Sequence, residues 1–127
     1  MDTLGNLLGV IVSAANIQDR EGAIALMATL NRMLCLRLQK IWADAGYTGE
    51  RLLHWLWKQF QILLEVVKRS DDVTGFTVLP KRWIVERTLG WLNRYRRLSK
   101  DYEHCTRSSE GMIYLASIAT MLKRLAP

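Results

Sequence analysis

The chain of 127 residues is poor in the features that mark several classes of protein. Its two cysteines, Cys35 and Cys105, have no CxxC or Cys/His spacing, so the sequence predicts neither a disulfide scaffold nor a zinc site. With two prolines and 24% charged residues, it does not resemble a disordered chain. No apolar run reaches the roughly 18 residues of a membrane span. We therefore expect a single domain, residues 1–127, with no membrane segment, in a reducing cytoplasm.

Acidic residues are also in the minority, and the excess of positive charge is concentrated in one segment. Residues 81–107 contain eight lysines and arginines and three acids, which gives a local charge of +5 out of +6 for the whole chain. A clustered basic surface of this kind is typical of proteins that bind nucleic acid. The alternative is a solvated charged face with no ligand.

Strand-like and helix-like patterns alternate along the chain. Strands are predicted at Leu7–Ala14, covered on both faces, at the end of Arg37–Ala43, and at Gln61–Lys68. Helices are predicted at 20–34 after an N-cap at Asp19, at Glu50–Phe60, at Lys81–Leu98, and at Gly111–Leu125 with Ser108 or Ser109 as its cap. Ser70–Pro80 is predicted to be a loop.

This order predicts an α/β fold in which at least some strands are parallel. A buried strand directly after Met1 leaves no room for earlier strands. The sheet is therefore expected to be incomplete, or to be completed by another chain.

Asp44 is the first candidate for chemistry. It directly follows the predicted second strand, and ligand sites of open α/β sheets lie at the carboxyl ends of strands. Small neighbours, Ala43, Ala45 and Gly46, let a ligand approach the carboxylate. The alternative is an aspartate that only caps a turn, with glycine providing the bend.

Glu86 is the second candidate and lies in the most basic part of the chain. On a helix it shares a polar stripe with five other positions, Arg82, Gly90, Asn93, Arg97 and Lys100. A glycine within a helix costs about 1 kcal/mol relative to alanine, which close approach of a ligand would explain. The alternative is a first-turn glutamate that pairs with Arg82.

The remaining cationic and aromatic side chains of this segment suggest a phosphate-binding surface. Arg87, Arg94 and Arg96 flank the polar stripe, where they can track a phosphate backbone with Arg82 and Arg97. Trp91 and Tyr95 have the spacing of core residues, although such rings can also stack on bases.

Several motifs in order resemble the C-terminal half of DDE transposases of bacterial insertion sequences. They are DTLG at 2–5, ANIQDREG at 15–22, WADAGYTG at 42–49, RWIVERT at 82–88 and WLNRYRRLSKDYE at 91–103. The resemblance covers nearly the whole chain. It implies a ribonuclease H-like mixed sheet flanked by helices, which lacks its N-terminal strand or strands in this chain.

The resemblance also implies a set of site residues. The family uses two aspartates and a glutamate to bind two divalent metals, Mg²⁺ or Mn²⁺. Asp44 corresponds to the second aspartate and Glu86 to the glutamate, and both are expected to be catalytic and metal-binding. Arg82, four residues before Glu86, is part of the family signature. The chain departs from that signature at Leu79, where a tyrosine is common, and at Asn93, where a lysine is common.

The largest departure lies at the N-terminus. In the family the first catalytic aspartate lies on the first strand, whereas the DTLG motif matches the turn between the second and third strands, so Asp2 is not expected to be that aspartate. The chain therefore resembles a truncated transposase, or the product of a second reading frame.

The function implied by the resemblance is DNA transposition, through metal-dependent cleavage and strand transfer at insertion-sequence ends. The isolated chain is expected to be inactive, and the main alternative is an inactive remnant that still binds DNA. A carboxylate-pair hydrolase acting on sugars is disfavoured by the basic surroundings. Expected partners are the DNA ends and target, together with an upstream transposase fragment or a second copy, in a bacterial cytoplasm at the nucleoid.

Overall fold

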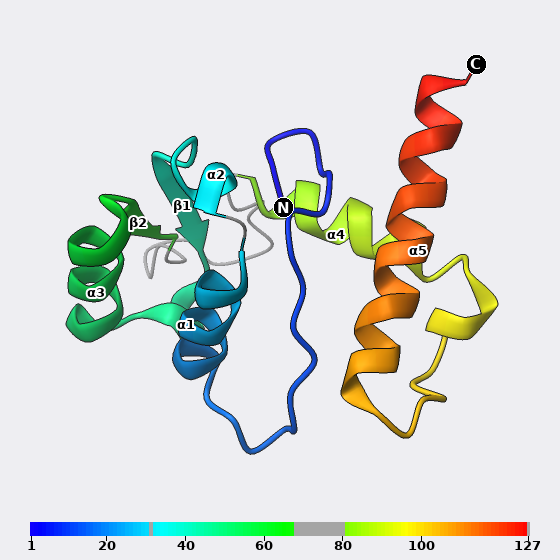
Figure 1. Cartoon of the computed structure of the whole chain (residues 1–127), viewed down its shortest axis with the longest axis horizontal. Coiled ribbons are helices and arrows are strands. Elements are labelled where there is room, and N and C mark those ends of the chain that lie inside the picture. The colour runs from blue at the N-terminus through cyan, green and yellow to red at the C-terminus, as the bar shows by residue number, and fades with distance from the viewer. Residues whose placement is uncertain (31, 68–80, 127) are drawn as a thin grey trace, which may run out of the picture. The chain divides into compact units, whose positions relative to one another are not determined.

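A computed structural model describes residues 1–30, 32–67 and 81–126 of the chain (Figure 1). The chain forms two compact units, residues 15–80 and residues 1–14 with 81–127. We call them the sheet unit and the helical unit and describe each by itself. That residues 1–127 form a single domain stays a prediction. Among the described residues, no helix is long and apolar enough to cross a membrane.

The sheet unit is built around a strand–helix–strand segment. Strand β1 (Lys40–Ala43), helix α3 (Glu50–Phe60) and strand β2 (Leu63–Val66) follow one another. The strands pair in parallel, with Ile41 opposite Leu64, as the βαβ connection requires. The α/β class and the parallel pairing are therefore confirmed, and both strands are shorter than their predicted segments.

Helix α3 has the bounds that its amphipathic pattern predicted. It ends where Gln61 adopts a left-handed conformation, and the N–H groups of Gln61 and Ile62 donate to the carbonyls of Trp57 and Leu56. Ile62 is fully buried directly after this turn, so the end of the helix directs the chain into β2.

The core of the sheet unit lies between α3, the strands and the helix that precedes them. Its buried side chains are Met27, Cys35, Leu52, Leu56 and Ile62. Cys35 is therefore a small core residue, and both cysteines are free thiols.

The first predicted helix is divided in the structure. Helix α1 (Asp19–Thr29) ends because Leu30 adopts an extended conformation, and a short helix, α2 (Arg32–Cys35), follows. Gln18 occupies the N-cap position, so Asp19 lies in the first turn and is not the cap. The prediction of one helix over 20–34 missed the break at Leu30, and the prediction of Asp19 as its cap was wrong by one residue.

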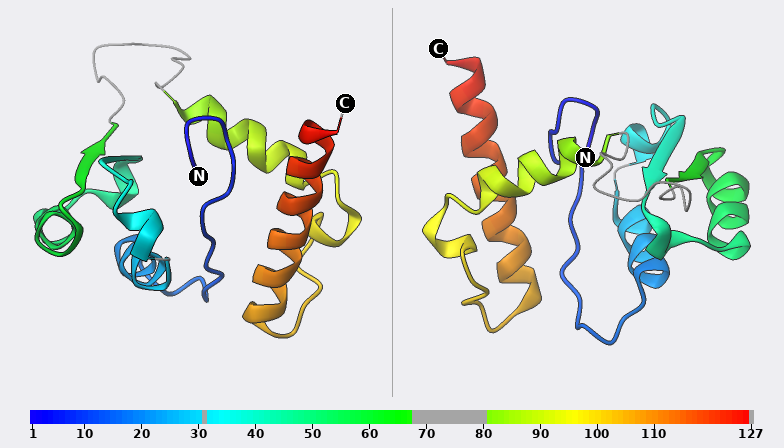
Figure 2. Two further views of the ribbon diagram at one scale, coloured as in Figure 1. Left: turned by 45° about the horizontal axis from the view of Figure 1, so that its top comes forward. Right: turned by 180° about the vertical axis from the view of Figure 1, so that it is seen from behind.

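The helical unit contains α4 (Arg82–Leu92), the short 3₁₀ helix η2 (Arg96–Leu98) and α5 (Thr106–Leu125) (Figure 2). The predicted helix Lys81–Leu98 was too long. Tyr95 is extended, and its hydroxyl forms a hydrogen bond of 3.1 Å with Thr120 of α5. This tertiary contact accompanies the break, which the sequence periodicity did not indicate.

Helix α5 begins five residues before its predicted start, and neither predicted serine caps it. Cys105 is at the N-cap position without a side-chain cap. Ser109 lies inside the helix, where its hydroxyl donates to Asp101 Oδ1 at 3.0 Å. A serine that precedes an apolar run is a cap only when no earlier turn extends the helix.

The predicted strand Leu7–Ala14 is not a strand in the structure. These residues form no ladder, and their apolar side chains are only half-buried. The N–H of Val10 donates to the hydroxyl of Tyr114, and that of Val12 to Glu110 Oε1 at 2.9 Å. Side chains of α5 thus accept hydrogen bonds from backbone N–H groups that would otherwise pair with a neighbouring strand. The predicted loop Ser70–Pro80 lies outside the described residues.

Candidate active site and nucleic-acid interface

Asp44 lies at the carboxyl end of β1, as predicted, and begins a tight turn. The short 3₁₀ helix η1 (Ala45–Tyr47) follows it, and Asp44 is its N-cap. The Asp44 carboxylate accepts one hydrogen bond, from the Gly46 N–H at 3.1 Å, and the residue is exposed. Asp44 therefore caps this turn, and its role as a metal ligand stays a prediction. The cap uses one Oδ1 contact and leaves acceptor capacity for a cation.

Asp19, from the start of α1, lies beside the same turn. A Cβ added to Gly46 would be 2.7 Å from Asp19 Oδ2 and 3.2 Å from Asp44 Oδ1, so both carboxylates lie against this glycine. Burial, followed by the negative charges of Asp19 and Asp44, raises the pKa of the Tyr47 phenol. Tyr47 therefore remains a neutral hydroxyl next to two acids.

Arg20 contacts the far end of the turn. Its guanidinium donates to the Thr48 carbonyl and to Gln18 Oε1, each at 3.3 Å. Gly49 has a φ of 156°, and a Cβ there would be 3.0 Å from Arg20 Nη1. Asp19 and Arg20 were not among the predicted site residues. The only signal was their presence in the ANIQDREG motif.

Glu86 lies in α4 on an exposed face of the helical unit. Arg82 Nε donates to Glu86 Oε1 at 2.9 Å, which confirms the predicted pairing one turn apart. An exposed pair of this spacing contributes about 0.3–0.5 kcal/mol, so a ligand can displace it. Because α4 ends at Leu92, the predicted polar stripe stops at Gly90, and Asn93, Arg97 and Lys100 lie beyond the helix.

The arginines predicted to bind DNA have different surroundings. Arg94 and Arg96 are exposed, and their side chains form no hydrogen bond or ion pair within the described residues. Arg97 is also exposed, and it donates to Glu103 Oε1 at 2.7 Å. Arg94 and Arg96 are thus the most available cations of the five.

Arg87 is held by its own unit. Its guanidinium stacks between Trp83 and Trp91, at 4.7 and 4.6 Å from the ring centroids, and donates to the Leu4 carbonyl at 2.8 Å. Its Nε is buried, and none of the described residues accepts a hydrogen bond from it. Arginine–aromatic contacts contribute about 0.5–2 kcal/mol according to their exposure, so this half-buried Arg87 contributes to the fold. Its role in DNA binding stays a prediction.

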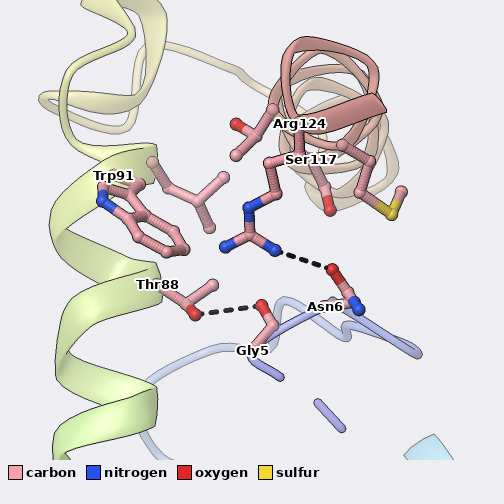
Figure 3. Close-up of a pocket in the computed structure, with 9 residues that line it drawn as sticks. Gly5, Asn6, Thr88, Trp91, Ser117 and Arg124 are labelled. Atoms are coloured by element: carbon pink, nitrogen blue, oxygen red, sulfur yellow. Dashed lines mark hydrogen bonds between the residues drawn. The ribbon is translucent and has the colours of Figure 1, made fainter. Parts of the chain in front are cut away.

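Trp91 also lines a small cavity of about 10 Å³ between α4, α5 and the N-terminal turn (Figure 3). Arg124 lies 4.3 Å from the Trp91 ring centroid and donates to Asn6 Oδ1, while the Thr88 hydroxyl donates to the Gly5 carbonyl. The cavity is the size of one water molecule. Together with the bond between Tyr95 and Thr120, these contacts favour the core-packing interpretation of the two aromatic residues.

Asp2 lies in the turn beside this cavity. Its carboxylate accepts hydrogen bonds from the N–H groups of Leu4 and Asn6 and from the Asn6 amide, at 2.8–2.9 Å. Burial acts to raise the Asp2 pKa, but these bonds, together with one from Gly5, outweigh it and lower the pKa. The turn accounts for Asp2 without any catalytic role.

The two candidate acids have the donor chemistry that Mg²⁺ or Mn²⁺ requires, since both offer exposed carboxylate oxygens. Asp44 belongs to the sheet unit and Glu86 to the helical unit. Within the part of the chain that the structure describes, no three carboxylate, histidine or cysteine side chains gather closely enough to hold a metal. That Asp44 and Glu86 share a metal site stays a prediction.

The sheet unit thus has an exposed acid at the end of a parallel strand, and the helical unit has a helix that carries Arg82, Arg87 and a second exposed acid. The family described as Transposase DDE domain matches residues 1–122. The chain is 31% identical over 108 residues to "Putative transposase for insertion sequence element IS402" from Burkholderia cepacia. That match covers 80% of this chain and 50% of the relative, so the chain spans about half the length of the curated relative. No solved structure matches this chain.

The chain therefore belongs to the family of transposase DDE domains. The resemblance seen in its motifs is confirmed at the level of the family.

Proposed function

We propose that the chain serves DNA transposition, as the part of a transposase that carries two of its metal-binding acids, Asp44 and Glu86. The observation that supports it best is the position of Asp44. It is exposed at the carboxyl end of a parallel strand, and its carboxylate has spare acceptor capacity. The match of the family to residues 1–122 includes both acids. The β1–α3–β2 segment is proposed to belong to a ribonuclease H-like sheet.

The proposed reaction is cleavage of a phosphodiester at an insertion-sequence end, followed by strand transfer into target DNA. An oxygen of water or of a DNA 3′-hydroxyl bonds to phosphorus, and the opposite oxygen leaves. Bound Mg²⁺ or Mn²⁺ would lower the pKa of the attacking group and stabilise the leaving oxygen. Asp44 and Glu86 would hold the metal as carboxylate ligands.

The basic surface of the helical unit is proposed to bind the DNA backbone. Arg94 and Arg96 supply available positive charge, and Arg82 and Arg97 can exchange their acidic partners for phosphate. The alternative function is DNA binding without cleavage. It has the same support from the basic residues and does not need Asp44 and Glu86 to converge.

Metal-dependent nicking of insertion-sequence-end DNA distinguishes the two functions. The assay uses this chain both alone and within a full-length transposase. Asp44→Asn and Glu86→Gln keep size and hydrogen-bonding capacity but remove charge. Each should lower the nicking rate by more than the roughly 10–100-fold that loss of an outer partner of a metal ligand costs.

Glu50→Gln is the matched control, because Glu50 is an exposed acid in the first turn of α3. It should leave nicking unchanged. If the parent protein nicks DNA and the Asp44 and Glu86 variants do so equally fast, both acids are excluded from catalysis. Salt-dependent DNA binding without any nicking in either context would support the DNA-binding alternative.

A further inference from the structure

The turn after Asp44 is tied to α1 by a single cationic side chain. Arg20 Nη1 donates to the Thr48 carbonyl at 3.3 Å, while Nη2 of the same guanidinium donates to Gln18 Oε1 at 3.3 Å. Arg20 therefore links Gln18, the residue before α1, to Thr48, the residue after η1. The planar guanidinium fork can make both bonds at once, which a lysine ammonium cannot do in the same geometry.

The turn itself is short and internally bonded, so that fixing one end constrains the other. The Tyr47 N–H donates to the Asp44 carbonyl and the Thr48 N–H to the Ala45 carbonyl, both at 3.2 Å. The Thr48 hydroxyl also donates to the Ala45 carbonyl at 2.7 Å. Only three residues, Ala45 to Tyr47, therefore separate Asp44 from the Thr48 carbonyl that Arg20 contacts, with few free backbone torsions between them.

Glycines at two positions let α1 approach this closely. At Gly49, a side chain would be 3.0–3.3 Å from atoms of Arg20, and at Gly46 it would be 2.7 Å from Asp19 Oδ2. The Arg20 side chain thus lies directly against the backbone that leads into α3. The Asp19 carboxylate lies against the glycine that donates to Asp44.

We infer that Arg20 is a positioning residue for Asp44: it fixes the 44–49 turn, so that the acid is held in place before a metal or DNA arrives. The inference rests on the proposed function of Asp44. A rigid support of this kind matters because metal ligands must be held within about 0.5 Å of their working geometry. Arg20 itself is not assigned to contact the metal or the DNA.

The test measures the order of the turn and the binding of Mn²⁺ separately. In Arg20→Ala, the amide order parameters of Gly46, Tyr47 and Thr48 should fall from about 0.85 towards 0.6 or below. Those of Ile41 and Trp42 in β1 should not change. The Mn²⁺ affinity, from broadening of the Gly46 amide signal, should fall about tenfold, as for loss of an outer partner of a ligand.

Two further variants make the result specific. Arg20→Lys keeps the charge and one donor, so it should restore part of the order and affinity. Arg51→Ala removes an exposed arginine of α3 whose side chain makes no hydrogen bond or ion pair within the described residues, and it should behave like the parent. If Arg20→Ala changes the turn no more than Arg51→Ala does, or loosens β1 equally, the inference is overturned.

Asp44→Asn separates this inference from the function on which it rests. If Asp44→Asn leaves the Mn²⁺ broadening at Gly46 intact, the metal assignment of Asp44 is wrong, and the role of Arg20 in serving it fails too. If Asp44→Asn abolishes the broadening while Arg20→Ala changes neither order nor affinity, only the positioning role fails.

Discussion

The two units hold their candidate acids in opposite ways. In the sheet unit, Asp44 begins a turn that is bonded internally and tied to α1 by Arg20. In the helical unit, Glu86 lies on an exposed helix face and forms an ion pair with Arg82 one turn away. Tertiary contacts thus set the position of the first acid. The side chain of the second acid has no contact outside its own helix among the described residues, so it can adjust its rotamer when a ligand binds.

The arginines show a similar contrast, since Arg87 is held by contacts within its unit while the side chains of Arg94 and Arg96 form no hydrogen bond or ion pair within the described residues. Removing the latter two is expected to change DNA binding most. Replacing Arg94 and Arg96 together by Ala should reduce the log–log salt slope of DNA binding by about 1.8, since each phosphate contact contributes about 0.9. At 0.1 M salt this is a loss of roughly 60-fold in affinity. Fluorescence anisotropy of labelled duplex DNA from 50 to 300 mM salt measures both quantities.

Arg87→Ala is the matched control for charge on the same unit. It should destabilise the fold, because the guanidinium contacts Trp83, Trp91 and Leu4, and it should reduce the salt slope by less than the roughly 0.9 expected for each of Arg94 and Arg96. If the slope falls for Arg87→Ala and not for the double variant, the DNA-binding surface has been placed on the wrong side chains.

What the sequence predicted correctly was local. The bounds of α3 and the position of β1 before Asp44 follow from the periodicity of apolar residues within each segment and from the small residues that mark its ends. The ion pair of Arg82 and Glu86 follows from helical spacing. The family was predicted from motifs in order, and its match to residues 1–122 confirms it.

What the sequence did not predict depends on partners far away in the chain. The run Leu7–Ala14 has the composition of a strand, but its recorded N–H partners are Tyr114 and Glu110, about a hundred residues later. The end of α4 at Leu92 accompanies the bond from Tyr95 to Thr120. Arg20 reaches the Asp44 turn only because α1 folds back onto it. Periodicity carries no information about any of these contacts.

Glycines on the two units should respond to alanine in opposite directions. Gly49→Ala should lower the free energy of unfolding by about 1–3 kcal/mol, because Gly49 has a φ of 156° and Arg20 fills the space beside it. Gly90→Ala should raise it by about 0.5–1 kcal/mol, since Gly90 lies within α4 and a Cβ there meets nothing within 4 Å. Urea denaturation followed by circular dichroism measures both.

The Gly90 variant also tests the idea that a ligand approaches α4 closely at this point. If DNA contacts the helix backbone there, Gly90→Ala should weaken DNA binding while it stabilises the fold. A stabilised variant with unchanged binding would show that the glycine is not needed for close approach.

The smallest effect is expected from Asp2, the turn aspartate of the helical unit, which differs from Asp44 in having its carboxylate oxygens occupied. Hydrogen bonds lower its pKa below the value of 3.8 expected in the unfolded chain, although burial opposes them. A carboxyl whose pKa is lower in the folded state stabilises the fold fully above the unfolded pKa. That contribution is lost as the pH falls through the folded pKa. Because solvent screens this partly exposed carboxylate, Asp2→Asn should cost less than about 1 kcal/mol at pH 7, with a smaller difference between variant and parent below about pH 4. Thermal unfolding between pH 3 and 7 measures this difference in stability.

A constant difference between Asp2→Asn and the parent across that pH range would mean that the ionised carboxylate does not stabilise the turn. Mn²⁺ binding should be unchanged in Asp2→Asn, and its loss there, with none in Asp44→Asn, would exchange the assignments of the two aspartates.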